Sequence, residues 1–276
     1  MVTFKMGLVY KYGSKDCIKY LLEDQTLRFA PSSAQNDINE FLPNLAPHLE
    51  NLIQQTALDL QVETFPFDRE HENAFRIGVI RGWLDTVNVK YSTAGILSLT
   101  TKRGDLLMWA HYAEKGTGLC VGFDETAAIF VESSFSGTQL IGINPVRYSS
   151  DRPTIDGRPE AERFVEMALT KSKDWEYEQE VRCIRNFADR DDRRIRFDPS
   201  DVKEIILGSS ISKESVLKCI ELHAQHFSHA ELLWAQPDLG QYKMLFCPVP
   251  KPDLLDICAY RESLGDFDGL QPFGKA

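Results

Sequence analysis

Short apolar segments with strand character, separated by helices at irregular spacing, constrain the fold of this chain most. Residues 8–12, 95–100, 118–123 and 181–186 have the length and composition of strands, and amphipathic helices separate some of these segments but not others. A doubly wound parallel sheet needs strands and helices that alternate evenly. The chain also has no Gly-x-Gly-x-x-Gly turn after a strand and no P-loop. The pattern therefore predicts an α+β fold with a mixed or antiparallel core sheet that is split into halves.

Two amphipathic stretches between the first strands and the next one predict a helical insertion at about 45–90. One begins at Pro47 and runs to about Leu60, and the other covers about residues 68–87. The 276 residues are enough for one large domain or two small ones, and the sequence has no internal repeat and no evident linker. We predict a single domain over 1–250, followed by a C-terminal extension at 251–276 in which Asp, Gly and Pro are frequent.

The net charge of −10 argues against non-specific binding of nucleic acid, because neutralising phosphates requires clustered Lys and Arg. The arginines between Asp189 and Phe197 alternate with aspartates, which favours a self-compensated surface hairpin. No apolar run approaches the length of a membrane span, and the first six residues do not resemble a secretory signal. The six cysteines are scattered among apolar neighbours, as in proteins of a reducing compartment, so we predict a cytoplasmic protein without a membrane partner.

The segment from Trp175 to Ile184 carries two carboxylates, Glu178 and Glu180, at the start of a predicted strand. Because side chains alternate faces along a strand, these two carboxylates are expected to face the same site. Like charges that close cost free energy unless a cation, a sugar hydroxyl or a shared proton uses them. The alternative is a solvated strand edge at which both glutamates lie in water, with Arg182 as a possible partner.

Further polar and aromatic side chains gather at strand ends or beside them. They are Tyr10, Lys11, Tyr12, Asn36, Asp37, Glu40, Ser98, Thr100, Trp109, His111, Tyr112 and Tyr177. Ordinary structural roles compete with function here: Trp109 and Tyr112 are three residues apart on a predicted helix, a spacing typical of core residues, and Asn36-Asp37 is typical of a turn. Three histidines recur at spacings of three from His223, but no carboxylate or cysteine completes a ligand set, so we predict no metal site.

Five motifs, taken in order, resemble the bacterial family known as domain of unknown function 2971. The resemblance extends from about residue 8 to about residue 208, and the family name implies no activity. The motifs are Leu8-Val9-Tyr10-Lys11-Tyr12, Asn36-Asp37, the segment from Leu107 to Ala113, the segment from Gly118 to Asp124, and the segment from Trp175 to Arg182.

The order of these motifs is also similar to that of the ADP-ribosyltransferase superfamily, whose members have a first-strand Arg or His, a Ser/Thr-rich strand and a Glu-x-Glu pair. The resemblance places Lys11 and Tyr12 at the first motif, Ser98 and Thr100 at the second, and Glu178 and Glu180 at the third. Lys11 departs from the usual Arg or His, and Ser98-Leu99-Thr100 departs from the usual Ser-Thr-Ser. The resemblance implies an ADP-ribosyltransferase-like sheet, NAD as the substrate, and a role as a toxin or phage-defence effector.

The same resemblance implies the role of each site residue. Glu180 would accept a hydrogen bond from a ribose hydroxyl, and Glu178 would orient or deprotonate the acceptor. Tyr12 or Tyr112 would stack on the nicotinamide ring, and Lys11 would meet a phosphate. The remaining cofactor-binding positions are Tyr10, Asn36, Asp37, Ser98, Thr100, Trp109 and Tyr177, and His111 is a further candidate acid or base.

The sequence does not identify the acceptor of the ADP-ribosyl group, which could be a protein side chain, a nucleic-acid base, a small molecule or water. With water as the acceptor, the chain would be an NAD glycohydrolase. Two other hypotheses stay open as well. One is a non-catalytic module that binds a nucleotide-like ligand or a protein, which the departure at Lys11 favours. The other is a different hydrolase that uses Glu178, Glu180 and His111.

Overall fold

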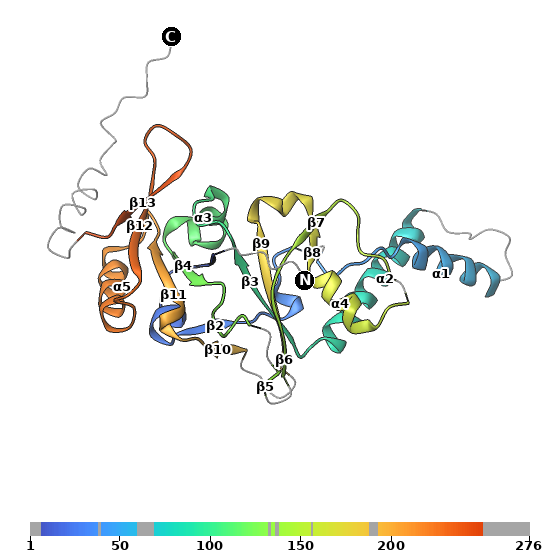
Figure 1. Cartoon of the computed structure of the whole chain (residues 1–276). Coiled ribbons are helices and arrows are strands. Elements are labelled where there is room, and N and C mark those ends of the chain that lie inside the picture. Colours follow the sequence, from blue (N-terminus) through green and yellow to red (C-terminus); the bar gives the residue numbers. More distant parts are fainter. Residues whose placement is uncertain are drawn as a thin grey trace, which may run out of the picture. The chain divides into compact units, whose positions relative to one another are not determined.

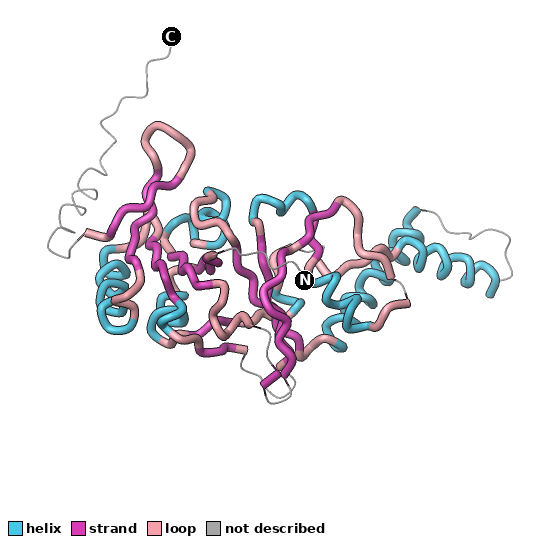
Figure 2. Tube along the Cα trace, in the orientation of Figure 1, coloured by secondary structure: helices cyan, strands magenta, loops and turns pink. Residues whose placement is uncertain are grey.

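The structure is a computed structural model of the chain. It describes residues 7–37, 40–59, 69–131, 134–135, 138–155, 157–187 and 193–250. The predicted C-terminal extension lies outside the described residues, as does most of the arginine-rich stretch after Phe187. Helices and strands are mixed along the chain (Figures 1 and 2), and most of the paired strands are antiparallel, so the predicted α+β class is confirmed.

The chain divides into two compact units. Unit 1 consists of Met1–Val9, Leu27–Lys102 and Glu125–Ile195, and unit 2 of Tyr10–Thr26, Arg103–Asp124 and Arg196–Ala276. The chain therefore passes between the units several times, so neither unit is one continuous segment of sequence. The predicted single domain over 1–250 stays a prediction.

Unit 1 contains four strands in the order β3-β9-β6-β5, which pair antiparallel. Their bounds are Ala94–Thr100 for β3, Glu180–Asn186 for β9, Thr138–Pro145 for β6 and Ser134–Phe135 for β5. Two short strands, β7 (Arg147–Ser149) and β8 (Thr170–Ser172), pair parallel beside them. In the central pair, Thr100 lies opposite Glu180 and Ser98 lies opposite Arg182.

Helices α1 (Ala46–Asp59) and α2 (Arg69–Lys90) lie where the helical insertion is predicted. A third helix, α4 (Glu160–Ala168), packs Phe164 and Met167 into a core shared with Val87 of α2 and Ile96 of β3. Figure 1 shows α2 between α4 and α1 in this unit. The apolar residues Phe164, Met167 and Ala168 in the sequence predict a helix over 159–171. That prediction is wrong at its end, because α4 stops at Ala168 and the chain continues as strand β8.

Unit 2 contains the strand order β13-β12-β11-β4-β1, except that the first two residues of β1, Leu8 and Val9, are assigned to unit 1. Their bounds are Met244–Pro248 for β13, Glu231–Pro237 for β12, Val202–Leu207 for β11, Leu119–Asp124 for β4 and Leu8–Gly13 for β1. Strands β11 and β12 are parallel, and α5 (Lys213–His226), whose N-cap is Ser212, connects them. Helix α3 (Leu106–Tyr112) begins after Asp105, whose carboxylate accepts hydrogen bonds from the backbone N–H groups of Leu107 and Met108.

Short elements complete the fold. Strands β2 (Thr26–Arg28) and β10 (Arg194–Arg196) pair with each other. Helical turns occur at Ile18–Glu23, Ser32–Ala34, Glu114–Gly116, Lys173–Glu178 and Pro199–Asp201. The spacing of Ile18, Leu21 and Leu22 in the sequence predicts a helix over 15–23. The observed helical turn is shorter, since it begins only at Ile18.

Candidate functional site

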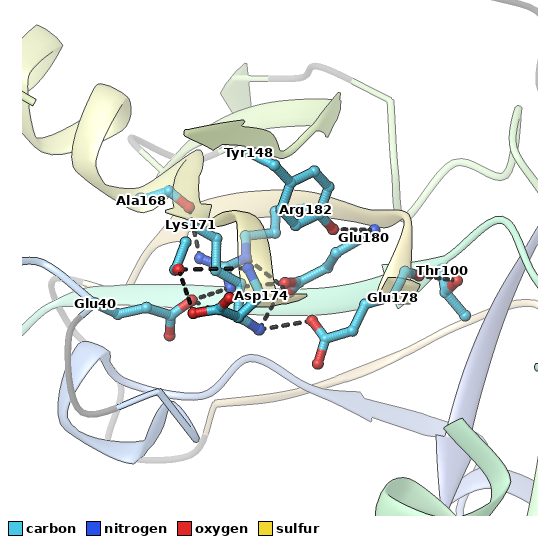
Figure 3. Close-up of polar contacts among 10 residues, drawn as sticks. Glu40, Thr100, Tyr148, Ala168, Lys171, Asp174, Glu178, Glu180 and Arg182 are labelled. Atoms are coloured by element: carbon cyan, nitrogen blue, oxygen red, sulfur yellow. Dashed lines mark hydrogen bonds and ion pairs between the residues drawn. The ribbon is translucent and has the colours of Figure 1, made fainter. Parts of the chain in front are cut away.

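Five buried charged side chains of unit 1 form one cluster, which we call the Lys171 cluster (Figure 3). Its members are Glu40, Lys171, Glu178, Glu180 and Arg182. Their side chains are at most 6% exposed. Three carboxylates against two cations give the cluster a formal charge of −1. The predicted alternative in which both strand glutamates lie in water is therefore wrong, although the suggested pairing with Arg182 is confirmed.

Glu180 and Arg182 form a two-point ion pair along β9. Nε of Arg182 donates to Oε1 of Glu180 at 2.7 Å, and Nη2 donates to Oε2 at 2.8 Å. The two residues share a face of the strand because they are two positions apart. Nη1 of Arg182 donates to the carbonyl oxygen of Ala168 at 2.7 Å, and Nη2 also donates to Oε1 of Glu40. All the nitrogens of this buried guanidinium therefore have acceptors.

Lys171 on β8 joins the carboxylates of the cluster to one another. Its Nζ donates to Oε2 of Glu178 at 2.6 Å and to Oε2 of Glu180 at 3.4 Å, and lies 4.0 Å from Oε1 of Glu40. The ammonium also lies 4.5 Å from the ring centroid of Trp175, within the range of a cation–π contact. Lys171 is thus the group that keeps three acidic side chains close to one another.

The backbone before β9 brings Glu178 to the cluster by a route that the sequence does not predict. Glu178 ends the helical turn Lys173–Glu178 and is not part of the strand, and Gln179 follows in a left-handed conformation with φ of 41°. The hydroxyl of Thr100 donates to the carbonyl oxygen of Glu178 at 2.5 Å. The backbone N–H of Glu180 donates to the hydroxyl of Tyr148 at 2.8 Å. The two glutamates therefore converge through a turn, and strand periodicity is the wrong reason for their shared direction.

The electrostatics of the cluster keep Glu180 ionised. Burial by itself would raise the pKa of this carboxyl, but the charge and hydrogen bonds of Arg182 outweigh burial. The charge of Lys171 and a hydrogen bond from the Ser98 hydroxyl lower the pKa further, to about 2. Burial raises the pKa of Glu40, against the lowering effect of Arg182 and Lys171. Glu180 is therefore firmly ionised, whereas the ionised form of Glu40 depends on the positive charges beside it.

A cavity of about 180 Å³ adjoins the Lys171 cluster in unit 1. Glu40 and Lys171 lie in its lining together with Asp37, Thr170, Asp151 and Arg152. Most of these side chains are polar or charged. The cavity connects part of the charge cluster to space that a small ligand can occupy.

Several of the predicted site residues do come together in unit 1. The Ser98 hydroxyl bonds to the Glu180 carboxylate, whereas the Thr100 hydroxyl donates to the backbone carbonyl oxygen of Glu178. Asp37 is buried and lines the cavity, and Asn36 is exposed. Tyr177 is half-buried with its ring 6.1 Å from that of Trp175.

The remaining predicted residues belong to unit 2, where several have structural contacts. Tyr12 is buried with its ring edge against Trp109, at a centroid distance of 5.1 Å. The hydroxyl of Tyr10 donates to Glu204 at 3.2 Å, and a side chain at Gly122 would lie within 2.8 Å of the Tyr10 ring. Trp109 thus belongs to the core of unit 2, which is the structural role that its helical spacing suggested.

The other three predicted residues of unit 2 are more accessible than Tyr12 and Trp109. Lys11 and Tyr112 are half-buried, and His111 is exposed. The predicted roles of Tyr10, Tyr12, Trp109 and these three residues in a nucleotide site stay predictions.

Sequence reasoning did not find Lys171, and it did not include Glu40 or Arg182 among the site residues. The spacing of Glu180 and Arg182 in a strand is a signal that could have found the arginine. Glu40 lies 142 residues from Arg182, and no local pattern predicts that pairing. Lys171 was predicted to be at the end of a helix, where its side chain has no defined relation to Glu178.

The histidines of unit 2 have protein contacts of their own. One ring nitrogen of His223 bonds to the carbonyl oxygen of Ala230 at 2.9 Å, and one of His229 lies 3.0 Å from the carbonyl oxygen of Pro199. Among the residues that the structure describes, no group of three His, Cys, Asp or Glu side chains is placed to hold a metal ion. The described helices include none with the length and apolar character needed to cross a membrane.

Comparison with known proteins supports the family resemblance. Residues 108–183 match the model of a family described as "Protein of unknown function (DUF2971)". This match agrees with the family that the motifs predict, although it is shorter than the predicted range from residue 8 to 208. It covers most of α3, all of β4 and every member of the Lys171 cluster except Glu40. No curated protein and no solved structure matches the chain. The resemblance to the ADP-ribosyltransferases stays a prediction.

Proposed function

We propose that this chain is an enzyme that breaks the nicotinamide–ribose bond of NAD and transfers the ADP-ribosyl group to an acceptor, on an ADP-ribosyltransferase-like fold. The observation that carries the proposal is the convergence of two buried carboxylates, Glu178 and Glu180, on Lys171 at the start of β9. The excess of carboxylates in the Lys171 cluster supports a site that stabilises positive charge.

The chemistry needs such a site. When the C1′–N bond breaks, the bonding electrons leave with nicotinamide, and the ribose carbon becomes positively charged, as in glycoside hydrolysis. The acceptor then forms a bond to C1′ and loses a proton. A carboxylate that is ionised before the reaction begins stabilises the developing charge without reorganisation at the moment of bond cleavage.

Glu180 fits the role of the ionised carboxylate, because its pKa of about 2 keeps it charged at neutral pH and Ser98 holds it in place. In the proposal it accepts a hydrogen bond from a ribose hydroxyl, and Glu178 orients the acceptor or takes its proton. A ribose hydroxyl reaches Glu180 by replacing the contact with Lys171. At 3.4 Å, that contact is longer than the hydrogen bonds of Glu178 with Lys171 and of Glu180 with Arg182.

The acceptor is a protein side chain, a nucleic-acid base, a small molecule or water, and with water the same site is an NAD glycohydrolase. A toxin or phage-defence role rests on analogy with the superfamily. The proposal rests on the acids of unit 1 and draws no support from Lys11, Tyr12 and Tyr112, which belong to unit 2.

A second candidate is a non-catalytic module that binds a nucleotide-like ligand or a protein. The observation that favours it is that both oxygens of Glu180 already bond to Arg182, while Glu178 is bonded to Lys171. Carboxylates paired in this way can serve the fold alone. If the cluster has only a structural role, the protein should bind its ligand without chemical turnover.

The test uses the purified full-length protein with NAD. Nicotinamide release is followed by liquid chromatography, with and without a cell extract as the source of acceptors, and NAD binding is measured by calorimetry. Release supports the enzyme, and release without extract identifies water as the acceptor. Binding without release contradicts the enzyme and supports the second candidate. Absence of both contradicts the enzyme and a module that binds NAD, and it favours the hypothesis of a different hydrolase.

A further inference from the structure

The cavity beside the Lys171 cluster is acidic on balance. Asp37, Glu40 and Asp151 contribute three carboxylates to its lining, and Arg152 and Lys171 contribute two cations. The lining is in contact with the rest of the Lys171 cluster, which is Glu178, Glu180 and Arg182. These three side chains add a further formal charge of −1. The potential in the cavity therefore favours a positively charged occupant over a neutral or negative one.

The cations of the cluster already use their donors within the protein. Arg182 donates to Glu180 twice, to Ala168 and to Glu40. Lys171 donates to Glu178 and Glu180, and its ammonium faces the Trp175 ring. A ligand in the cavity that offered only acceptors would compete with these buried pairs.

One acceptor of the cluster is left over. Oε2 of Glu40 is buried and accepts no hydrogen bond from any part of the chain that the structure describes. Glu40 is 5% exposed, and it lines the cavity. Figure 3 shows its other oxygen joined to the cations of the cluster. A buried carboxylate oxygen without a donor costs free energy, so a donor supplied from the cavity would stabilise the unit.

We infer that this cavity binds a small organic cation, an ammonium or guanidinium group, that donates a hydrogen bond to Oε2 of Glu40. The cation adds the donor that the cluster lacks and balances its formal charge of −1. Asp37 provides a second carboxylate in the same cavity. This inference goes beyond the proposed function and does not depend on it, because it concerns Glu40 and not the acids assigned to ribose chemistry.

The test compares two probes of nearly the same shape, N-methylguanidinium and neutral N-methylurea, by calorimetry with the full-length protein. We expect saturable binding of N-methylguanidinium that is at least about tenfold tighter than that of N-methylurea. Equal affinity for the two probes, or no saturable binding of the cation, would overturn the inference. This comparison uses the wild-type protein, so it stands even if a variant fails to fold.

Variants then assign the site. Glu40→Gln keeps the shape of the side chain but removes its charge, and we expect it to weaken binding of the cation by about tenfold or more. Asp37→Asn is a second variant, for which we expect a smaller loss. Glu162→Gln makes the same change on an exposed residue of α4 and should bind like the wild type. Undiminished binding to a folded Glu40→Gln variant would contradict the site. Because NAD is not involved, failure of the nicotinamide assay leaves this result unaffected.

Discussion

Glu180 and Arg182 form an ion pair on one face of β9, with Nε–Oε1 and Nη2–Oε2 distances of 2.7 and 2.8 Å. The same guanidinium donates to the carbonyl oxygen of Ala168 at the end of α4 and to Glu40. It therefore ties the strand, the helix and the segment before α1 to one another. Arg182 is fully buried, so these contacts are made without access to solvent.

Replacing Arg182 should destabilise the protein strongly. Arg182→Gln leaves the carboxylates of Glu40 and Glu180 buried with fewer partners, and removing one partner of a buried ion pair typically costs about 3–5 kcal/mol. The free energy of unfolding, from urea denaturation, measures the effect.

The matched control is Arg158→Gln, because Arg158 pairs with Glu166 at the surface of the same unit. We expect that change to cost less than about 1 kcal/mol. Equal losses for the two variants would show that the buried pair has no special role in stability.

The contribution of Glu180 to stability should depend on pH in a defined direction. Its pKa is lowered from an ordinary value of 4.5 to about 2 in the folded protein. Burial alone would raise this pKa, but the charge and hydrogen bonds of Arg182 outweigh burial. A carboxyl with a lowered pKa stabilises the folded state above pH 4.5, and this stabilisation is lost as the pH falls toward 2. The difference in unfolding free energy between the wild type and Glu180→Gln should therefore shrink over this range. A difference that stays constant would contradict the assigned ionisation.

Ser98 should set part of that pKa. Its hydroxyl bonds to the Glu180 carboxylate, so Ser98→Ala is expected to raise the pKa of Glu180 and to cost about 1 kcal/mol of stability. Carbon-13 NMR titration of the glutamate carboxyl groups reports the shift. Ser92→Ala changes an exposed serine of the same unit and should leave the titration of Glu180 as it is in the wild type. An unchanged pKa in Ser98→Ala would show that the hydroxyl does not support the acid.

In unit 2, Asp105 should stabilise α3 as its N-cap. Its carboxylate accepts from the backbone N–H groups of Leu107 and Met108 at 2.9 and 3.2 Å. Asp105→Ala should lower the free energy of unfolding by about 0.5–2 kcal/mol, whereas Asp105→Asn should retain most of the cap. Equal losses in the two variants would argue that the charge of Asp105, and not its capping bonds, supports the helix.

Local patterns in the sequence were sufficient to predict most of the elements. Apolar periodicity placed β1, β3, β4 and β9 within one or two residues. These features depend on neighbours within a few positions, which the sequence contains directly.

The site could be predicted only in part. Glu178 and Glu180 were identifiable because two acids at the start of a strand need an explanation, but their partners were not. Lys171 reaches them because the chain leaves α4 early, forms β8 and returns through a helical turn, and Glu40 arrives from a distant segment. Such pairings depend on tertiary packing, which no short window of sequence specifies.

The most direct test of the central claim is nicotinamide release from NAD by the wild type, Glu178→Gln, Glu180→Gln and the surface control Glu162→Gln, at a temperature at which thermal melts show all four to be folded. Because Glu180 belongs to a buried ion pair, its variant is expected to melt at a lower temperature than the wild type. The account predicts release by the wild type and the control, and a decrease of about 100-fold or more in both cluster variants. Undiminished release by a folded Glu180→Gln protein, or no release by the wild type, would contradict it.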